Sequence, residues 1–399
     1  MKDRIASTES GDDLEQIQPG YLGITPPPGK LPEKGQRTWV DRPELLLHAV
    51  KALVKSSIVA VDAEFTQIRL RSQNNVVTYS QRLALLQLAI DGQCFVVDAL
   101  RLNDLSPLTA VVENPAIIIL LHGAGSDLRV MAERGLNVAH YYDLEATCRS
   151  IFGQHESSLA AMLQRAFQVR LDKSLQRTDW TRRPLPPAMV AYAARDAEMT
   201  LALYYWLDEH FRWALKIHES TNQQEPVTAW IEPFLRGASP VPADVAVAES
   251  MEQGIILNQE QLVVDCRAVL MSLTHPTRRS RLLRLIADLA LVELFPEIEP
   301  LLSAQTVEER AAAIRTLNRL DGVRSKPLIL PLLYDPVQDV RKVVQTALRT
   351  PLNKEPRSKW TIPIKSTDGT RRWTVGETGE TSSIDENDWK ARLRSFIDE

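Results

Sequence analysis

SIVAVDAEF, residues 57–65, is the most informative segment of this chain. Its apolar run predicts a buried strand, and Asp62 and Glu64 follow at the end of that run, two residues apart. Side chains at positions i and i+2 of a strand point to the same side of the sheet. Two carboxylates on one face of a core strand are costly unless a positive group meets them, and a divalent metal ion suits that role. Taken alone, an Asp-x-Glu pair after a strand more often begins a loop.

Two later segments add carboxylates at positions where ligands gather in α/β proteins. Pro115–His122 predicts a second buried strand, and Gly-Ala-Gly-Ser leads from it to Asp127, which opens a helical pattern at a strand-to-helix junction. Further on, residues 186–207 carry apolar side chains at helical spacing. Within them Tyr192 and Asp196 are four residues apart and would share one helix face. A surface aspartate beside a half-buried tyrosine is the plainer interpretation of that pair.

Asp-x-Glu, then Asp, then Tyr-x-x-x-Asp, in this order on a strand, a junction and a helix, resembles the three exonuclease motifs of the DEDD superfamily in its tyrosine subclass. The likeness is greatest to ribonuclease D and the Werner-type exonuclease domain, and it covers about residues 37–215. One departure is the segment between Glu64 and Leu83, which is longer than expected and indicates a differently shaped loop. Further matches are RLALLQLAIDG (82–92), FVVDAL (95–100), HGAGSDLRVM (122–131) and LDKSLQRTDWTRRPLPPAMVAYAARDAEMT (171–200).

The resemblance implies an α/β fold with a ribonuclease H-like domain, in which helices flank a mixed central sheet. It also implies two divalent ions, Mg²⁺ or Mn²⁺, about 3.5–4 Å apart, which activate a water and stabilise the departing 3′-oxygen. By this resemblance Asp62 bridges both ions. Glu64 and Asp196 hold the ion that activates water, and Asp127 holds the other. Tyr192 orients the attacking water, because a phenol with a pKa near 10 is a weak base at neutral pH.

Four further residues are candidates for contacts with the substrate. Lys173, Trp180 and Arg183 match the family's segment before its third motif, and His122 closes the strand that leads to Asp127. Ordinary packing or a surface charge explains the first three equally well, so their assignment depends on the resemblance.

The composition is that of a soluble protein from the cell interior. The chain has 399 residues, 44% of them hydrophobic, which is enough for two or three domains. No apolar stretch approaches the length of a membrane span, and the first residues lack the apolar core of a signal peptide, so we expect a cytoplasmic location and no membrane association. Three widely separated cysteines show no metal-type spacing and are expected to be reduced. The net charge of −4 argues against a strong non-specific DNA-binding face.

Pattern and composition divide the chain into five parts. A spacing of 31 places Arg279, Arg310 and Arg341 in register, which resembles short HEAT-like helical repeats. We expect these arginines to be structural, with Glu308 and Asp339 as acidic partners, in preference to a row of phosphate contacts. The predicted parts are a disordered leader (1–35), the exonuclease domain (36–215), a linker with a connecting helix (216–257), the repeats (258–350), and a β-hairpin with a terminal helix (351–399).

The predicted function is 3′-to-5′ exonucleolytic hydrolysis of RNA, with single-stranded DNA as an alternative substrate and nucleoside 5′-monophosphates as products. RNA processing or turnover is the expected role, and the repeats are a candidate surface for a protein partner. The other interpretation is a binding scaffold that keeps the fold without turnover. All four carboxylates and Tyr192 are present, whereas a decayed site usually loses at least one of them.

Overall fold

The structure is a computed structural model of the chain, and it describes residues 26–31, 35–71, 77–171, 178–219, 227–236, 242–256 and 258–349. All of these residues fall within one compact unit, Met1–Pro356. Most of the predicted leader, Lys173, the predicted hairpin and the terminal helix lie outside the described residues. Within the described ranges, no helix combines the length and the apolar character that a membrane span requires.

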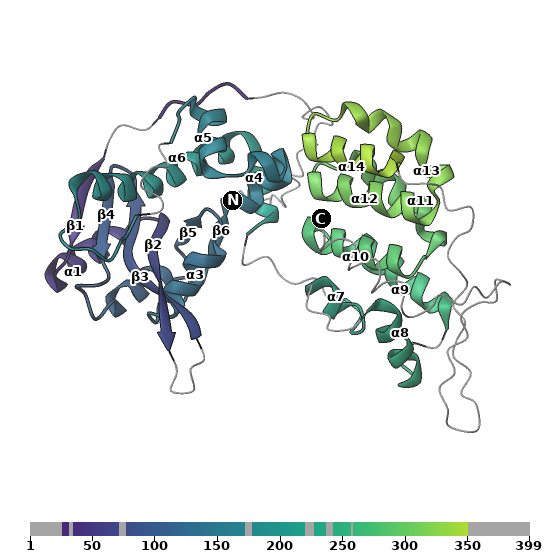
Figure 1. The fold of residues 1–399 in the computed structure, drawn as a ribbon, viewed down its shortest axis with the longest axis horizontal. Helices are drawn as coiled ribbons and strands as arrows, with labels where there is room; N and C mark the ends of the chain where they lie inside the picture. Colours follow the sequence, from purple (N-terminus) through teal and green to yellow (C-terminus); the bar gives the residue numbers. More distant parts are fainter. Residues whose placement is uncertain are drawn as a thin grey trace, which may run out of the picture. The chain divides into compact units, whose positions relative to one another are not determined.

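A mixed sheet forms the centre of the first half of the described chain (Figure 1). Its strands are β1 (Gln36–Val40), β2 (Ile58–Arg71), β3 (Val77–Ile90), β4 (Gln93–Asp98), β5 (Ile118–Leu121) and β6 (Tyr141–Asp143). They lie in the order β1-β4-β3-β2-β5-β6. The β2-β3 and β3-β4 pairs are antiparallel, and the other three pairs are parallel. This arrangement confirms the predicted mixed central sheet.

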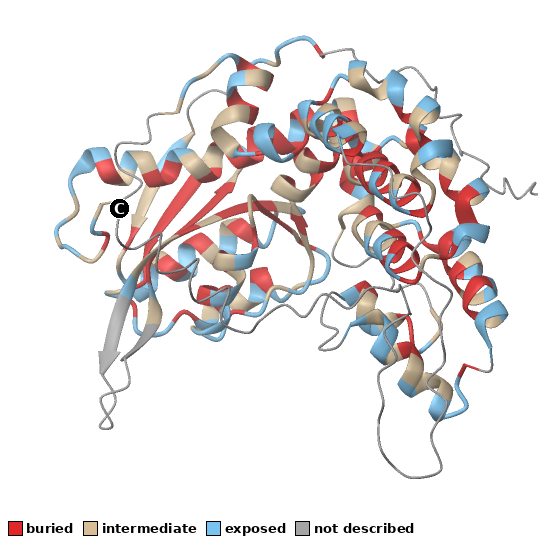
Figure 2. Cartoon of the chain, turned by 45° about the vertical axis from the view of Figure 1, so that its right-hand side comes forward, coloured by how far each residue is buried: buried red, intermediate tan, exposed pale blue. Residues whose placement is uncertain are grey.

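Helices cover both faces of this sheet, and Figure 2 shows the buried residues that run along its strands. The helices that pack onto one face are α4 (Leu144–Phe152), α5 (Leu159–Phe167) and α6 (Pro187–Ile217). The helices on the other face are α1 (Pro43–Leu53), α2 (Thr109–Val112) and α3 (Gly125–Ala132). Burial on both faces explains why the central strands are nearly continuous apolar runs in the sequence.

Strand β2 positions the first two predicted carboxylates and is longer than the sequence suggested. Ala60 packs into the core beneath α6, whereas Val61 packs into the opposite core. Because side chains alternate along a strand, Asp62 and Glu64 share the α6 side with Ala60. The backbone continues to Arg71 and pairs with β3, so the loop expected after the first motif is largely an antiparallel ribbon. The sequence analysis treated this segment as a loop of unusual shape and overlooked the pairing, although Arg71 pairs with Val77 only six residues further along the chain.

A bulge interrupts β3 beside the carboxylates. Leu85 pairs with Glu64 and Leu83 pairs with Phe65, which leaves Ala84 as an extra residue in β3. Leu85 and Ala84 both face the core beneath α6, whereas Leu83 faces the opposite core. A bulge of this kind changes the side to which the following side chains point.

The second half of the described chain is helical, as predicted. Its α-helices are α7 (Glu232–Arg236), α8 (Ala243–Glu252), α9 (Gln259–Ser272), α10 (Pro276–Asp288), α11 (Phe295–Ile298), α12 (Val307–Leu320), α13 (Gly322–Ile329) and α14 (Gln338–Arg349). Short 3₁₀ segments occur in both halves of the described chain, at Ser106–Leu108 and Gln154–Glu156 in the first half and at Val292–Leu294, Glu299–Ser303 and Leu330–Tyr334 in the second. Helix α12 packs against both α10 and α14, and these three helices carry the arginines spaced 31 apart. Their assignment to HEAT-like repeats stays a prediction.

Two of the three regularly spaced arginines join neighbouring elements of the helical region, and the third binds the loop before its own helix. Arg310 is fully buried, and its guanidinium donates to both carboxylate oxygens of Asp335, at 2.8 and 3.2 Å, and to two backbone carbonyls. Arg279 donates to Glu309, and Arg341 donates to the backbone carbonyl of Asp335. These contacts confirm the structural role expected for the arginines. The acidic partners are Glu309 and Asp335, and not the two residues expected from the sequence.

Candidate active site

Three of the predicted carboxylates converge between β2 and α6. Asp62 and Glu64 project from β2 on the side that α6 covers, and Asp196 lies in the first half of α6. One oxygen from each of these three side chains lies within 4.8 Å of the other two. Oxygen ligands gathered from separate elements at this spacing suit Mg²⁺ or Mn²⁺.

The electrostatics of these half-buried carboxylates are unfavourable without a cation. Burial raises the pKa of Glu64 to about 9, and repulsion by Asp62 adds to the shift. Burial also holds the pKa of Asp62 well above its usual value, with further repulsion from Asp127 and Asp196. The pKa of Asp196 rises to about 6 through burial, and a hydrogen bond from Tyr192 opposes that rise. A divalent ion among these groups would stabilise their charged forms.

Asp196 supplies a direct test of whether the site suits a metal. Its Oδ1 atom is buried and accepts no hydrogen bond within the described residues. A buried carboxylate oxygen without a donor costs free energy unless another positive group meets it. A hard divalent cation meets that need, so the residues present fit a metal ion bound by oxygen atoms.

Asp127 lies in the first turn of α3, at the strand-to-helix junction predicted from the sequence. Burial raises the pKa of this carboxyl to about 7, and repulsion by Asp143 contributes. Asp127 is not among the three residues whose oxygens lie within 4.8 Å of one another. Its charge nevertheless contributes to the raised pKa of both Asp62 and Glu64, so it borders the same site.

Asp143 supports this part of the site and was missed by the sequence analysis. Its carboxylate caps the N-terminus of α4 by accepting from backbone N–H groups of the first turn. The same carboxylate accepts from the backbone N–H groups of Gly123, at 3.0 Å, and Ala124, at 3.3 Å. It therefore fixes the segment that leads to Asp127. The cap follows a recognisable local pattern, but the bonds to a loop 20 residues away do not.

Tyr192 lies one helical turn before Asp196 and faces it. The phenol hydroxyl donates a hydrogen bond to the Asp196 carboxylate, and burial together with that carboxylate raises the pKa of the phenol above its usual value. The ring of Tyr192 stacks on Trp180, with ring centroids 6.2 Å apart and planes inclined by 29°. The tyrosine hydroxyl is therefore protonated and held in place at neutral pH.

The segment before α6 is anchored by Arg183. Its guanidinium donates to both carboxylate oxygens of Asp98, at 2.6 and 2.7 Å, and to the backbone carbonyls of Trp180 and Ala84. Ala84 is the bulge residue of β3, so Arg183 ties this segment to the sheet beside the site. Trp180 is 2% exposed. These contacts account for Arg183, whereas the indole nitrogen of Trp180 is buried without a hydrogen-bond partner among the described residues, and the substrate contacts predicted for both side chains stay predictions.

The structure does not test the substrate contacts predicted for His122 and Lys173. The Nε2 atom of His122 lies 3.0 Å from the carbonyl oxygen of Ser157, and burial lowers the pKa of the imidazole. Lys173 lies outside the described residues. The substrate roles of both stay predictions.

A family profile described as 3′-5′ exonuclease matches residues 37–211. Residues 37–211 are therefore similar to this exonuclease family. The match confirms the predicted likeness to DEDD exonucleases of the ribonuclease D type, and its limits agree with the predicted extent of the resemblance.

Several known proteins are similar to this chain over a stretch of comparable length. Ribonuclease D of Haemophilus influenzae is 30% identical over 165 residues, which are 41% of this chain and 39% of that protein. Protein RRP6-like 3 of Arabidopsis thaliana is 31% identical over 166 residues, 41% of this chain and 18% of that protein. The solved catalytic core of RRP6 from Trypanosoma brucei is 20% identical, with a TM-score of 0.42 and coverage of 82% and 83%. The chain thus spans about two fifths of the length of the ribonuclease D relatives.

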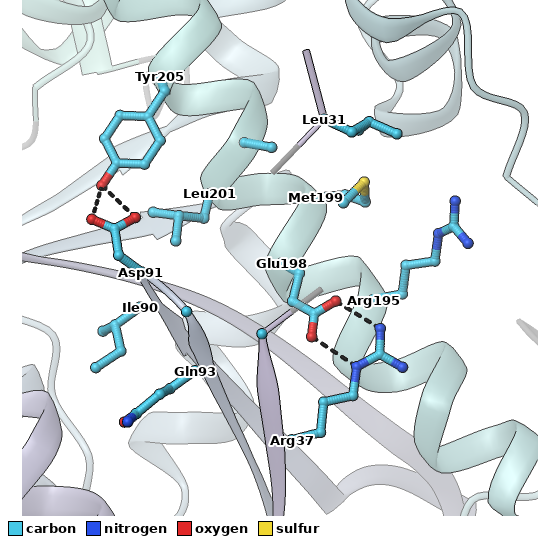
Figure 3. A pocket seen from close by; sticks show the side chains of 13 residues that line it. Leu31, Arg37, Ile90, Asp91, Gln93, Arg195, Glu198, Met199, Leu201 and Tyr205 are labelled. Atoms are coloured by element: carbon cyan, nitrogen blue, oxygen red, sulfur yellow. Dashed lines mark hydrogen bonds and ion pairs between the residues drawn. The ribbon is translucent and has the colours of Figure 1, made fainter. Parts of the chain in front are cut away.

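A separate hollow borders α6, and its lining does not include Asp62, Glu64 or Asp196 (Figure 3). It encloses about 160 Å³ and is bordered by β1, the turn between β3 and β4, and α6. Four of its polar side chains form two pairs: Arg37 donates to both oxygens of Glu198, and the Tyr205 hydroxyl donates to the Asp91 carboxylate.

Proposed function

We propose that the exonuclease domain removes nucleotides from the 3′ end of RNA and releases nucleoside 5′-monophosphates, in RNA processing or turnover. The observation that carries this proposal is the meeting of Asp62, Glu64 and Asp196 within 4.8 Å, beside a tyrosine that donates to one of them. RNA is favoured over single-stranded DNA because the domain is similar to proteins named ribonuclease D.

Each carboxylate would bind the metal ion on its own side of the site. Two divalent ions, Mg²⁺ or Mn²⁺, would supply a water of lowered pKa and positive charge beside the departing 3′-oxygen. Asp62, whose charge interacts with both Asp127 and Asp196, is the natural shared ligand. Glu64 and Asp196 would hold the ion on the water side, and Asp127 would hold the ion on the side of the leaving group.

Tyr192 would orient the attacking water. Its hydroxyl proton is engaged by Asp196, which leaves the phenol oxygen free to accept a hydrogen bond from that water. A hydrogen bond from the water to the phenol oxygen would orient the water so that one of its lone pairs points toward the phosphorus atom. Because the pKa of the phenol is raised, Tyr192 keeps its own proton and positions the water without acting as the base.

Matched substitutions in one helix test this proposal. Asp196→Asn should lower the rate of Mn²⁺-dependent release of mononucleotides from a 3′-hydroxyl oligoribonucleotide by at least about 10²-fold. Asp208→Asn, which changes an α6 carboxylate paired with Arg212 at the surface, should leave the rate unchanged. Near wild-type cleavage by the Asp196 variant would overturn the site assignment. Binding of RNA by the wild-type protein without cleavage in Mg²⁺ or Mn²⁺ would favour the scaffold.

The helical region has a separate proposed role. Its regular α10, α12 and α14 suit HEAT-like repeats, which would hold a protein partner and leave the chemistry to the exonuclease domain. A chain that ends after Glu219 keeps all the site carboxylates and the backbone bridge between Glu219 and Tyr142. This shortened chain should cleave a short oligoribonucleotide as fast as the full chain. A soluble but inactive shortened chain would mean that the helical region completes the site.

A further inference from the structure

Gln87 of β3 has no hydrogen bond partner where the fold should require one. Its side chain is 0% exposed, and neither its amide oxygen nor its amide nitrogen has a partner among the described residues. Burying an amide without hydrogen bonds is costly, and most buried side-chain polar atoms in folded proteins are paired. An apolar residue at this position would avoid that cost, so the amide needs an explanation.

The register of the sheet shows which group lies nearest to Gln87. Its neighbours on the same face of β3 are Leu85 and Ala89, and its partner in β4 is Val96, all three apolar. Its partner in β2 is Asp62, directly opposite in the antiparallel pair. Directly opposite side chains have Cβ atoms about 4.5–5.5 Å apart, within easy reach of a glutamine amide.

The more distant polar groups of β4 on this face are already engaged. Asp98 accepts from Arg183 through both carboxylate oxygens and also from the backbone N–H of Leu100. The Cys94 thiol donates to the carbonyl of Ala194. Asp62 is therefore the polar side chain that the sheet presents directly to Gln87.

We propose that Gln87 is a positioning residue for Asp62, an inference that rests on the proposed function. With metal bound, a rotation of the Gln87 side chain would bring its amide N–H to one oxygen of the Asp62 carboxylate opposite it, and its amide oxygen would accept from a water in the site. The hydrogen bond fixes the plane of that carboxylate, so that the remaining lone pairs of Asp62 point to where metal ions would bind. Groups that orient a ligand in this way commonly contribute 10- to 100-fold to metal affinity or activity.

A matched pair of glutamine substitutions tests this role. Gln87→Met keeps the length of the side chain and removes the amide. Gln81→Met makes the same change in the same strand, where Gln81 also has a buried, unpartnered amide oxygen but lies opposite Gln67, beyond the bulge. Mn²⁺ binding is measured by calorimetry without RNA, together with the melting temperature of the metal-free protein and the steady-state kinetics.

The expected result separates positioning from packing. Gln87→Met should weaken Mn²⁺ binding and lower kcat by roughly 10-fold or more, with a much smaller change in KM, while the metal-free protein melts at the same temperature or higher. Gln81→Met should leave Mn²⁺ binding and kcat unchanged. If Gln87→Met lowers the melting temperature but leaves Mn²⁺ affinity and kcat as in the wild type, the amide is structural and the proposal is wrong.

Two further arms keep the test decisive. If Gln87→Met does not fold, Gln87→Leu removes the same donor with a smaller side chain and is measured in its place. If the wild-type protein does not cleave RNA, the proposed function fails, and the Mn²⁺ affinities of the Gln87 and Gln81 variants still decide whether the amide positions Asp62.

Discussion

Glu64→Gln in the metal-free protein tests the electrostatics of the site most directly. The folded chain raises the pKa of Glu64 from an ordinary value of 4.5 to about 9, chiefly through burial. Below the ordinary value the carboxyl is protonated in both the folded and the unfolded chain, and it affects stability little. As pH rises toward 9, the unfolded chain ionises and the folded chain does not, so the free energy of unfolding of the wild type falls.

The size of this effect follows from the two pKa values. Each pKa unit corresponds to 1.36 kcal/mol, so at pH 7 Glu64 should lower the free energy of unfolding by about 3 kcal/mol. A glutamine of nearly the same shape does not titrate and removes this penalty. Glu64→Gln should therefore melt roughly 6 to 12 °C above the wild type at pH 7 in EDTA, given the usual melting shift per kcal/mol for a domain of this size. At pH 5 the two proteins should differ by less than about 1 kcal/mol.

Denaturant unfolding of the wild type and of Glu64→Gln, in EDTA at pH 5, 6, 7 and 8, measures the difference in their free energies of unfolding. Glu133→Gln, at an exposed position of the same domain, is the control and should follow the wild type at every pH. In a separate series, Mn²⁺ replaces EDTA. The free energy of unfolding of the wild type should then rise with pH, because ion binding needs ionised carboxylates and grows stronger as pH rises. A gain for Glu64→Gln that is equal at pH 5 and pH 8 would refute the reasoning, since it would come from packing and not from titration.

Two further predictions concern single side chains. Tyr192→Phe should lower the cleavage rate by about 10²-fold while calorimetry shows Mn²⁺ affinity nearly unchanged, because the phenol positions water and is not a ligand; loss of Mn²⁺ binding would contradict that role. Arg310→Ala should lower the free energy of unfolding by about 3–5 kcal/mol, since it leaves the buried Asp335 carboxylate without its partner. Arg319→Ala is the control: the Arg319 side chain is 58% exposed in its ion pair, so its loss should lower the free energy of unfolding by less than about 1 kcal/mol. Unchanged melting of Arg310→Ala together with weaker RNA binding would contradict the structural role of Arg310.

Local spacing and the family resemblance together indicated the candidate residues, because these residues are paired locally. Asp62 and Glu64 are two apart on a strand, and Tyr192 and Asp196 are four apart on a helix, so each pair shares a face whatever the rest of the fold does. Asp127 follows from the same logic, because a strand that runs into a helix places the junction at the edge of the sheet where ligands gather.

Other features depend on which strand pairs with which, and local patterns do not show that. The extension of β2 to Arg71 needs β3 as a partner, and the bulge at Ala84 is visible only in the register between these two strands. Gln87 looks like an isolated polar residue in an apolar strand until the register places it opposite Asp62. Arg310 likewise lies 25 residues from Asp335, which precedes α14, and no periodicity links the two residues.

The close approach of α6 to β2 also depends on the side chains between them. Three alanines of α6, Ala193, Ala194 and Ala197, are fully buried against the sheet. The distance between packed elements depends on the side chains at their contact, so small residues allow the helix to lie close to the strand. Asp196 lies within this run of alanines, and a close approach brings its carboxylate within 4.8 Å of the ligand atoms of β2. Bulky residues at these three positions would keep every site residue and still separate the carboxylates, so the alanine face of α6 is as necessary to the proposed metal site as the carboxylates themselves.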